Sequence, residues 1–204
     1  MNSIIIASRN GGKIREIKQI LTLDGVRLQD LREIGFDEPI EETGSSFEEN
    51  ALIKARAVYR RYGTWVVADD SGLVVPFLKG EPGVRSARYG GAGADDQENN
   101  RILLENMADA HGGQRKAWFV CVSILYCGEG NYRRAEGRVE GCITTEPRGD
   151  GGFGYDPLFF LQDLGKTMAQ LSDDEKNAIS HRGRAFRKFG EEIVRRLENQ
   201  SDQR

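Results

Sequence analysis

The sequence is poor in the residues that build zinc sites and disulfides. It contains three cysteines and two histidines among 204 residues. Cys121, Cys127 and Cys142 are odd in number and lack paired metal-ligand spacing, so we expect reduced, mostly buried thiols. Carboxylate oxygens remain as the candidate metal ligands, and such ligands favour Mg²⁺ over Zn²⁺.

Long apolar runs and an excess of one charge are also missing. The apolar run at residues 4–7 is too short for a signal peptide or a membrane span, so we expect a cytosolic chain. A net charge of −3 argues against bulk nucleic-acid binding but allows a small anion held by a few cations. No repeat or linker is evident, and we predict one domain over residues 1–204, with a frayed tail at 199–204.

The most informative stretch is residues 65–73, where an apolar run rich in β-formers leads into Asp69 and Asp70 and then Ser71-Gly72. The run predicts a short buried strand, and Ser-Gly predicts a turn directly after the acids. A strand that ends in acids commonly delivers charge to a cleft at the edge of a sheet. A solvated turn at the end of a strand is the alternative.

Residues 3–13 predict a strand, a loop and a helix. A buried strand at 3–7 is followed by the loop Ser-Arg-Asn-Gly-Gly-Lys, after which apolar residues repeat at helical spacing. The N–H groups at such a helix start suit a phosphate, and Lys13 would lie in the first turn. The loop lacks the Walker and dinucleotide-binding patterns, so a purely structural role is the alternative.

A second helix is predicted after Glu41-Glu42-Thr43-Gly44, with two overlapping capping boxes within residues 45–49. Asn50 and Lys54 lie four residues apart beside its apolar stripe, where both could point into a cleft next to the core. A lysine on a helix flank is also commonly just solvated.

The remaining elements are predicted from apolar patterning. Residues 117–126 are apolar on both strand faces, which favours a central position in a sheet, and 132–143 are expected to pair with them as a hairpin. We also predict a helix at 95–107, a strand at 158–161, a short helix opened by Ser172 and a final helix after residues 180–183.

Residues 148–157 form a loop in which glycines surround Phe153 and Tyr155 before Asp156-Pro157. Glycine lets backbone approach a ligand closely, and an aromatic ring there can stack on a flat base. A tight turn with its rings in the core is the alternative. Together with acids that could hold Mg²⁺ and lysines that could hold phosphates, this loop indicates nucleotide phosphate chemistry.

Six motifs in order carry a resemblance that covers nearly the whole chain. They are ASRNGGK at 7–13, ETGSSFEENA at 42–51 with Lys54-Ala55, ADDSGL at 68–73, PGV and SARY at 82–89, GGFGYDP at 151–157 and EKNAISHR at 175–182. With these motifs the chain resembles the inosine/xanthosine triphosphate pyrophosphatase family. The resemblance implies Mg²⁺-dependent hydrolysis of deaminated purine nucleoside triphosphates (ITP, dITP, XTP) to the monophosphate and pyrophosphate.

The resemblance also implies a fold and an assembly. The expected fold is α/β, with a mixed long central sheet flanked by helices and two lobes with the active-site cleft between them. A homodimer is expected, with one Mg²⁺ per subunit.

Site roles follow from the same resemblance. Glu41 and Asp70 would hold the metal, and Asp70 would also be the catalytic base. Because adjacent strand residues point to opposite faces, Asp69 is expected to have a supporting role instead. The residues expected to bind substrate are Ser8, Arg9, Asn10, Gly11, Gly12, Lys13 and Lys54 at the phosphates, Ser71 beside the acid, and Phe153, Gly154, Tyr155, Asp156, Lys176, His181 and Arg182 around the base.

Two other functions are left open by the sequence. One is a related α/β nucleotide pyrophosphatase that acts on modified pyrimidines or methylated nucleotides. The other is a non-catalytic nucleotide-binding module, in which the acids and lysines only hold a ligand.

Overall fold

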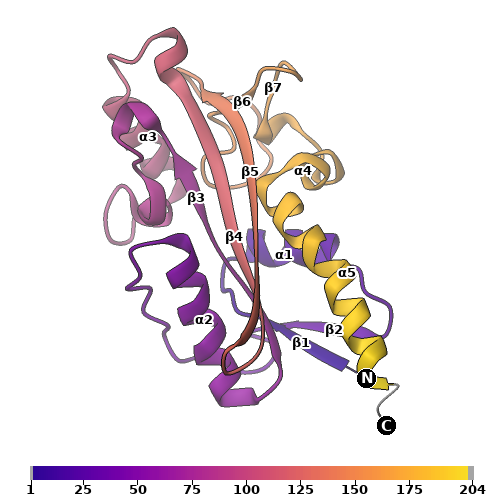
Figure 1. Cartoon of the computed structure of the whole chain (residues 1–204). Helices are drawn as coiled ribbons and strands as arrows, with labels where there is room; N and C mark the ends of the chain where they lie inside the picture. The colour runs from indigo at the N-terminus through magenta and orange to yellow at the C-terminus, as the bar shows by residue number, and fades with distance from the viewer. Residues whose placement is uncertain (1, 202–204) are drawn as a thin grey trace. The chain divides into compact units, whose positions relative to one another are not determined.

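The computed structural model describes residues 2–201 (Figure 1). Its helices and strands are β1 (Asn2–Ile6), α1 (Gly11–Ile20), β2 (Val26–Asp30), α2 (Phe47–Tyr62), β3 (Trp65–Val74), α3 (Asp96–Asn106), β4 (Lys116–Gly128), β5 (Asn131–Ile143), β6 (Phe159–Leu161), β7 (Lys166–Thr167), α4 (Asp173–Ile179) and α5 (His181–Ser201). Short 3₁₀ helices lie at Pro76–Leu78, Gly83–Arg88, Gly112–Arg115 and Met168–Gln170.

The strands form one mixed sheet in the order β2-β1-β3-β4-β5-β6-β7. β1 pairs in parallel with β2 and β3, whereas β6 pairs antiparallel with β5 and β7. The α/β class with a mixed sheet is therefore confirmed, and β4 has the central position that its two apolar faces predicted. β2 and β7 were not predicted, because β2 (VRLQD) has only two apolar residues and β7 has only two residues in all.

Internal contacts divide the chain into two compact units. Unit 1 contains the chain up to Asp70, Cys121–Gly137 and the part from Arg182 onward, and unit 2 contains Ser71–Val120 and Arg138–His181. Helix α5 extends through Ser201, into the segment predicted to be frayed, and residues 202–204 lie outside the described residues.

In unit 1, successive side chains of the parallel strands pack on opposite faces. Ile4, Ile6 and Val67 belong to a cluster with apolar residues of α1 and α5. Ile5 and Val66 belong to a second cluster, built with α2. This alternation follows from the two-residue period of a strand, and it puts α2 and α5 on opposite sides of these strands (Figure 1).

The predicted turn at Ser71-Gly72 is wrong, because β3 continues through both residues to Val74. A Cβ at Gly72 would lie 2.3 Å from Ser86 Oγ and 2.4 Å from the Gly83 carbonyl oxygen. Leu73 N–H donates to Ser86 Oγ at 2.9 Å. The glycine therefore permits a close approach of the Gly83–Arg88 helix rather than a reversal of the chain.

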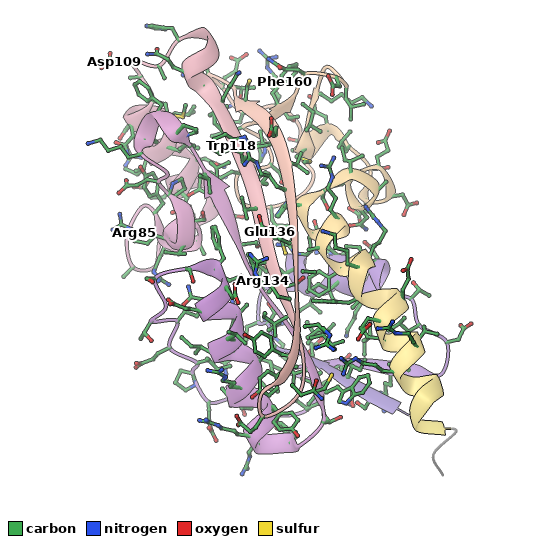
Figure 2. The ribbon with its side chains drawn as sticks, in the orientation of Figure 1. Arg85, Asp109, Trp118, Arg134, Glu136 and Phe160 are labelled. Carbon is green, nitrogen blue, oxygen red and sulfur yellow. The ribbon has the colours of Figure 1, made fainter. Side chains whose placement is uncertain are left out.

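β5 alternates between a buried and a solvent-facing side. On the solvent-facing side, Arg134 pairs with Glu136 at 2.6 Å and with Glu48 of α2 at 2.7 Å (Figure 2). The pattern is that of a strand with one covered face.

The cysteines are free, as predicted. Cys121 is buried, and Cys127 and Cys142 are partly buried. Over residues 2–201 no helix is both long and apolar enough to span a membrane.

Candidate active site

The parallel pairing of β1 with residues 65–67 of β3 puts the carboxyl edge of β1 beside the middle of β3, where Asp69 and Asp70 lie. Ala7 N–H donates to the Val67 carbonyl at 2.8 Å, so the loop after β1 and the acids after Val67 begin side by side. Asn10 caps α1, with its Oδ1 accepting from Lys13 N–H at 2.9 Å. The start of α1, with Gly11 and Gly12, therefore opens at this edge, where helix N–H groups suit an anion.

Arg9 and Ser8 stabilise this loop. Arg9 Nη2 donates to the carbonyl oxygens of Phe36 and Glu38 at 3.2 and 2.6 Å, and Ser8 Oγ accepts from Asn10 N–H at 3.3 Å. Arg9 thus ties the loop after β1 to the segment after β2.

Asp69 points to the side of α1 and α5, where it is surrounded by cations. Its Oδ2 lies 3.2 Å from Lys13 Nζ and 3.5 Å from the guanidinium of Arg182, which also pairs with Glu16. Burial raises the pKa of Asp69, but Lys13 and Arg182 outweigh it and hold the pKa well below its usual range. Asp69 is 1% exposed, so it is a buried, ionised carboxylate that orients two cations.

Asp70 points to the other side, toward α2. Asn50 Nδ2 donates to Asp70 Oδ2 at 3.0 Å, and Lys54 Nζ lies 3.6 Å from Asp70 Oδ1 and 3.0 Å from Glu42 Oε2. Burial raises the pKa of Asp70, against the opposing effect of Lys54. The two acids therefore differ: the pKa of Asp69 is lowered by its cations, whereas the pKa of Asp70 is raised and this carboxyl retains affinity for a proton.

Lys54 is 8% exposed and remains charged. Burial lowers its pKa, but Asp70, Asp69 and Glu42 more than offset this and the pKa is raised. Lys54 lines a pocket of about 100 Å³ with Ala7, Ser8, Arg9, Leu31, Ile40 and Glu42. This pocket of unit 1 thus brings Lys54 together with Ser8 and Arg9 of the loop after β1, and all three residues were predicted to bind the phosphates.

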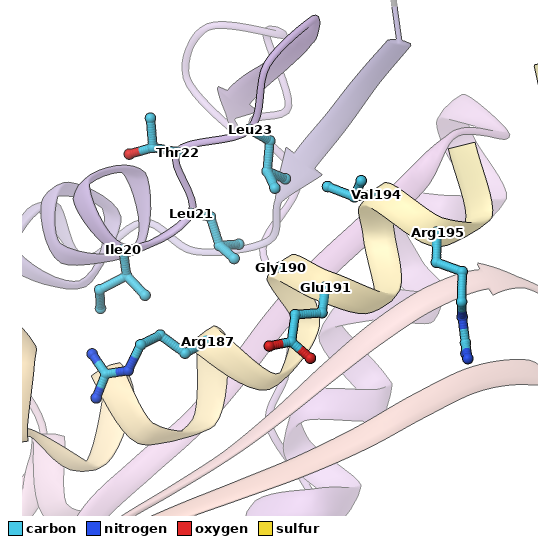
Figure 3. A pocket seen from close by; sticks show the side chains of 9 residues that line it. All are labelled: Ile20, Leu21, Thr22, Leu23, Arg187, Gly190, Glu191, Val194 and Arg195. Atoms are coloured by element: carbon cyan, nitrogen blue, oxygen red, sulfur yellow. The ribbon is translucent and has the colours of Figure 1, made fainter. Parts of the chain in front are cut away.

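A larger pocket of about 620 Å³ lies between the end of α1 and the middle of α5 (Figure 3). Leu21, Leu23 and Val194 line it together with Arg187 and Glu191. None of its lining residues belongs to the predicted site.

The predicted base-binding residues Phe153–Asp156 belong to unit 2 and form a constrained loop. Asp156 Oδ2 accepts from Phe153 N–H at 2.9 Å and also pairs with Lys176. Lys176 Nζ lies 4.7 Å from the centre of the Phe153 ring, within range of a cation–π interaction. The loop is therefore closed on itself around one buried ion pair.

Tyr155 is buried, and its hydroxyl donates to the Ser86 carbonyl at 2.9 Å. Burial raises the pKa of this hydroxyl, which stays protonated. His181 stacks on Phe119 with ring centres 4.8 Å apart, and Ser71 is partly exposed on β3. Tyr155, His181 and Ser71 belong to unit 2, while Arg182 belongs to unit 1.

The residues that contact the predicted site without having been assigned to it include Glu16, Glu42 and Asn50. Glu16 was detectable as an acid three residues after Lys13 on the same helix, and Glu42 as the neighbour of Glu41. Asn50 was noted for its spacing to Lys54, but its bond to Asp70 depends on the packing of α2 against β3.

The two carboxylates predicted to bind the metal suit an Mg²⁺ ion that is bound partly by the substrate. They are too few for a metal ion bound by protein ligands alone. Glu41 is exposed and Asp70 is mostly buried, and among the described residues no three His, Cys, Asp or Glu side chains form a metal-binding group. Mg²⁺ typically uses one or two carboxylates together with substrate phosphates. As a buried carboxylate on β3 next to the start of α1, Asp70 fits that mode of binding.

The sequence model of the Ham1 family matches residues 4–192. The chain belongs to the Ham1 family. It is 49% identical over 189 residues to the dITP/XTP pyrophosphatase of Bacillus subtilis (strain 168), which covers 93% of this chain and 96% of that one. The Thermus thermophilus dITP/XTP pyrophosphatase is 49% identical over 184 residues, or 90% and 88% of the two chains. The family resemblance predicted from the motifs is confirmed.

Solved structures support the same membership of the Ham1 family. A HAM1 protein from Coxiella burnetii has a TM-score of 0.87 at 40% identity, over 96% of this chain and 100% of that one. The nucleoside-triphosphatase / dITP/XTP pyrophosphatase from Mycobacterium abscessus has a TM-score of 0.73 at 44% identity, over 89% and 95%.

The buried position of Asp69 makes a prediction for stability. Asp69→Asn should lower the free energy of unfolding by about 3–5 kcal/mol, because it leaves Lys13 and Arg182 without their shared carboxylate. Glu136→Gln, which breaks an exposed pair, should cost less than about 1 kcal/mol. Urea denaturation of both variants measures the difference. Equal small losses would show that Asp69 does not hold the cations.

Proposed function

We propose that this chain hydrolyses deaminated purine nucleoside triphosphates (ITP, dITP and XTP) to the nucleoside monophosphate and pyrophosphate, with Mg²⁺. One observation carries the proposal. Asp69 holds Lys13 and Asp70 holds Lys54, so both lysines lie beside two adjacent acids of β3. The 49% identity with a dITP/XTP pyrophosphatase supports it.

The phosphates are bound by groups that are oriented in advance. Lys13 is held by Asp69, and Lys54 by Glu42 and Asp70, so both ammonium groups have a defined position before a triphosphate arrives. Ser8, Asn10, Gly11 and Gly12 present the loop and helix start to the same ligand. Preoriented cations stabilise the charge that develops on the leaving pyrophosphate.

Water attacks the α-phosphorus, a new O–P bond forms, and the bond between the α-phosphorus and the bridging oxygen breaks to release pyrophosphate. Asp70 is the proton acceptor for this water. Its two oxygens are held by Asn50 and Lys54, and burial raises the pKa of its carboxyl, which makes it a stronger base. Ser71 follows directly on β3 and contacts the substrate.

Glu41 and Asp70 are the residues that would hold Mg²⁺, which when bound neutralises phosphate oxygens. Glu41 is accessible for this role, and Asp70 supplies the buried charge.

The base is recognised by its C6 oxygen. Phe153 offers a ring for stacking, and Lys176, Arg182 and loop N–H groups can donate to that oxygen. Adenine presents an amino donor at C6 instead, so these donors would leave that amino group unsatisfied, at a cost of about 1–3 kcal/mol per mismatched group. The predicted base-binding residues also include Tyr155, Asp156 and His181, which are held by hydrogen bonds and by ring stacking.

The same resemblance supports a homodimer that works in the cytoplasm on the nucleotide pool. The partner in the reaction is the nucleoside triphosphate itself.

Pyrophosphate release from ITP, dITP, XTP, ATP and dUTP, with and without Mg²⁺, tests the proposal. The deaminated purine substrates should be hydrolysed at least tenfold faster than ATP, and removal of Mg²⁺ by a chelator should abolish release. Preference for dUTP would favour a pyrimidine pyrophosphatase, and binding without release would favour a non-catalytic module.

Asp70→Asn should lower turnover of ITP by about two orders of magnitude or more, the range associated with loss of a general base. The exposed Asp109 of unit 2 (labelled in Figure 2) provides a matched control, since Asp109→Asn makes the same chemical change at a residue that is not assigned to the site. A near-normal rate for Asp70→Asn in single-turnover measurements would remove Asp70 from the mechanism.

Arg182→Ala should reduce the preference for ITP over ATP by about tenfold, the effect of losing one charged donor. Thermal unfolding run in parallel shows how much of any loss comes from the broken contacts with Glu16 and Asp69. If kcat/KM falls equally for ITP and ATP, Arg182 does not recognise the base.

A further inference from the structure

Gly154, in the middle of the base-binding loop, is held on both sides by one helix of unit 2. Its N–H donates to Asp96 Oδ2 at 2.7 Å, and its carbonyl accepts from Asn100 Nδ2 at 3.0 Å. Asp96 and Asn100 are four residues apart on α3, so they lie on the same face of the helix.

These two hydrogen bonds orient two successive peptide planes. The Gly154 N–H belongs to the peptide shared with Phe153, and the Gly154 carbonyl belongs to the peptide shared with Tyr155. Because a trans peptide is planar, with N–H and C=O directed oppositely, the Phe153 carbonyl and the Tyr155 N–H are both directed away from α3. The Phe153 carbonyl accepts from Asp156 N–H at 3.3 Å within the loop. The helix thus determines the direction of the Tyr155 N–H, which is a backbone donor, and of the Phe153 carbonyl that closes the loop on Asp156.

Gly154 contributes little conformational preference of its own. Its φ is +62°, and a Cβ built there would meet no atom within 4 Å. Glycine is therefore required for its backbone angle and not for space, and a glycine adopts many other angles equally well. The position of this residue depends on Asp96 and Asn100.

The helix is a suitable anchor because its own position is well defined. Asp95 caps it by accepting from Glu98 N–H at 2.8 Å, and Leu103 and Met107 are fully buried in the core of unit 2. Asn99 accepts from Gly90 N–H at 2.8 Å. Groups carried on a rigid helix place a loop more accurately than contacts between loops do.

We propose that Asp96 and Asn100 are positioning residues for base recognition, acting through Gly154. This inference rests on the proposed function, in which the Phe153–Asp156 loop binds the purine. Tyr155 and Asp156 hold the flanks of the loop through Ser86 and Phe153, and the contacts with α3 hold its centre. Loss of these contacts relaxes the backbone groups that face the base and leaves the phosphate site of unit 1 unchanged.

Two isosteric substitutions separate positioning from simple stability. Asn100→Asp removes the donor to the Gly154 carbonyl and sets a carboxylate against it, whereas Asp96→Asn keeps an oxygen that accepts from Gly154 N–H. Asp96→Ala removes that acceptor. Asn106→Asp is the control on the same helix, because Asn106 donates to the Tyr89 hydroxyl and does not contact the loop.

The measurement is kcat and KM for ITP and for ATP, with thermal unfolding of each variant. Asn100→Asp and Asp96→Ala should lower the ITP-to-ATP ratio of kcat/KM by about tenfold, mainly through a higher KM for ITP. Asp96→Asn should retain most of the ratio that Asp96→Ala loses, and Asn106→Asp should match the wild type.

An unchanged ratio in folded Asn100→Asp and Asp96→Ala would overturn the inference, as would an equal loss in Asn106→Asp. Failure of the proposed function is recognised separately, because the wild-type protein would then release no pyrophosphate from ITP.

Discussion

The structure depends on two adjacent carboxylates in one extended strand. Each is buried, and a buried charge is tolerated only when it is paired or hydrogen-bonded. Because neighbouring strand residues point to opposite faces, the direct partners of the two acids come from different helices. Asp69 is compensated from α1 and α5, and Asp70 from α2. The requirement for charge compensation therefore couples helices on both sides of the unit 1 strands to the same pair of residues.

Part of the fold followed from local patterns. Periodicity and capping are local properties, and several predictions depended only on them. These were the two faces of β4, the helices after residues 44 and 95, and the opposite directions of Asp69 and Asp70. The turn at Ser71-Gly72 was wrong for a non-local reason. Whether a glycine reverses the chain or admits a neighbour depends here on Ser86, and that contact is tertiary.

The site shows the same division. Lys13, Lys54 and Asp70 occur in recognisable motifs, and they do converge with the loop after β1 in unit 1. The residues that orient them carry little signal by themselves. Glu42 and Asn50 lie within the motif at 42–51, but nothing in the sequence gives them or Asn100 a role, because that role arises only from the groups opposite them. Motifs thus identify the groups that do chemistry more readily than those that hold them in place.

Cys121 gives this arrangement an internal reporter. Its sulfur lies 3.8 Å from Asp69 Oδ2, and burial together with that carboxylate raises the pKa of the thiol. Only a thiolate reacts readily with alkylating reagents, so Cys121 is protected while the strands are closed. Its labelling requires local opening of the sheet, and the rate of labelling measures how often that occurs. Because Cys121 lies directly beside Asp69, it is a natural probe of how often the Asp69 carboxylate is exposed to water.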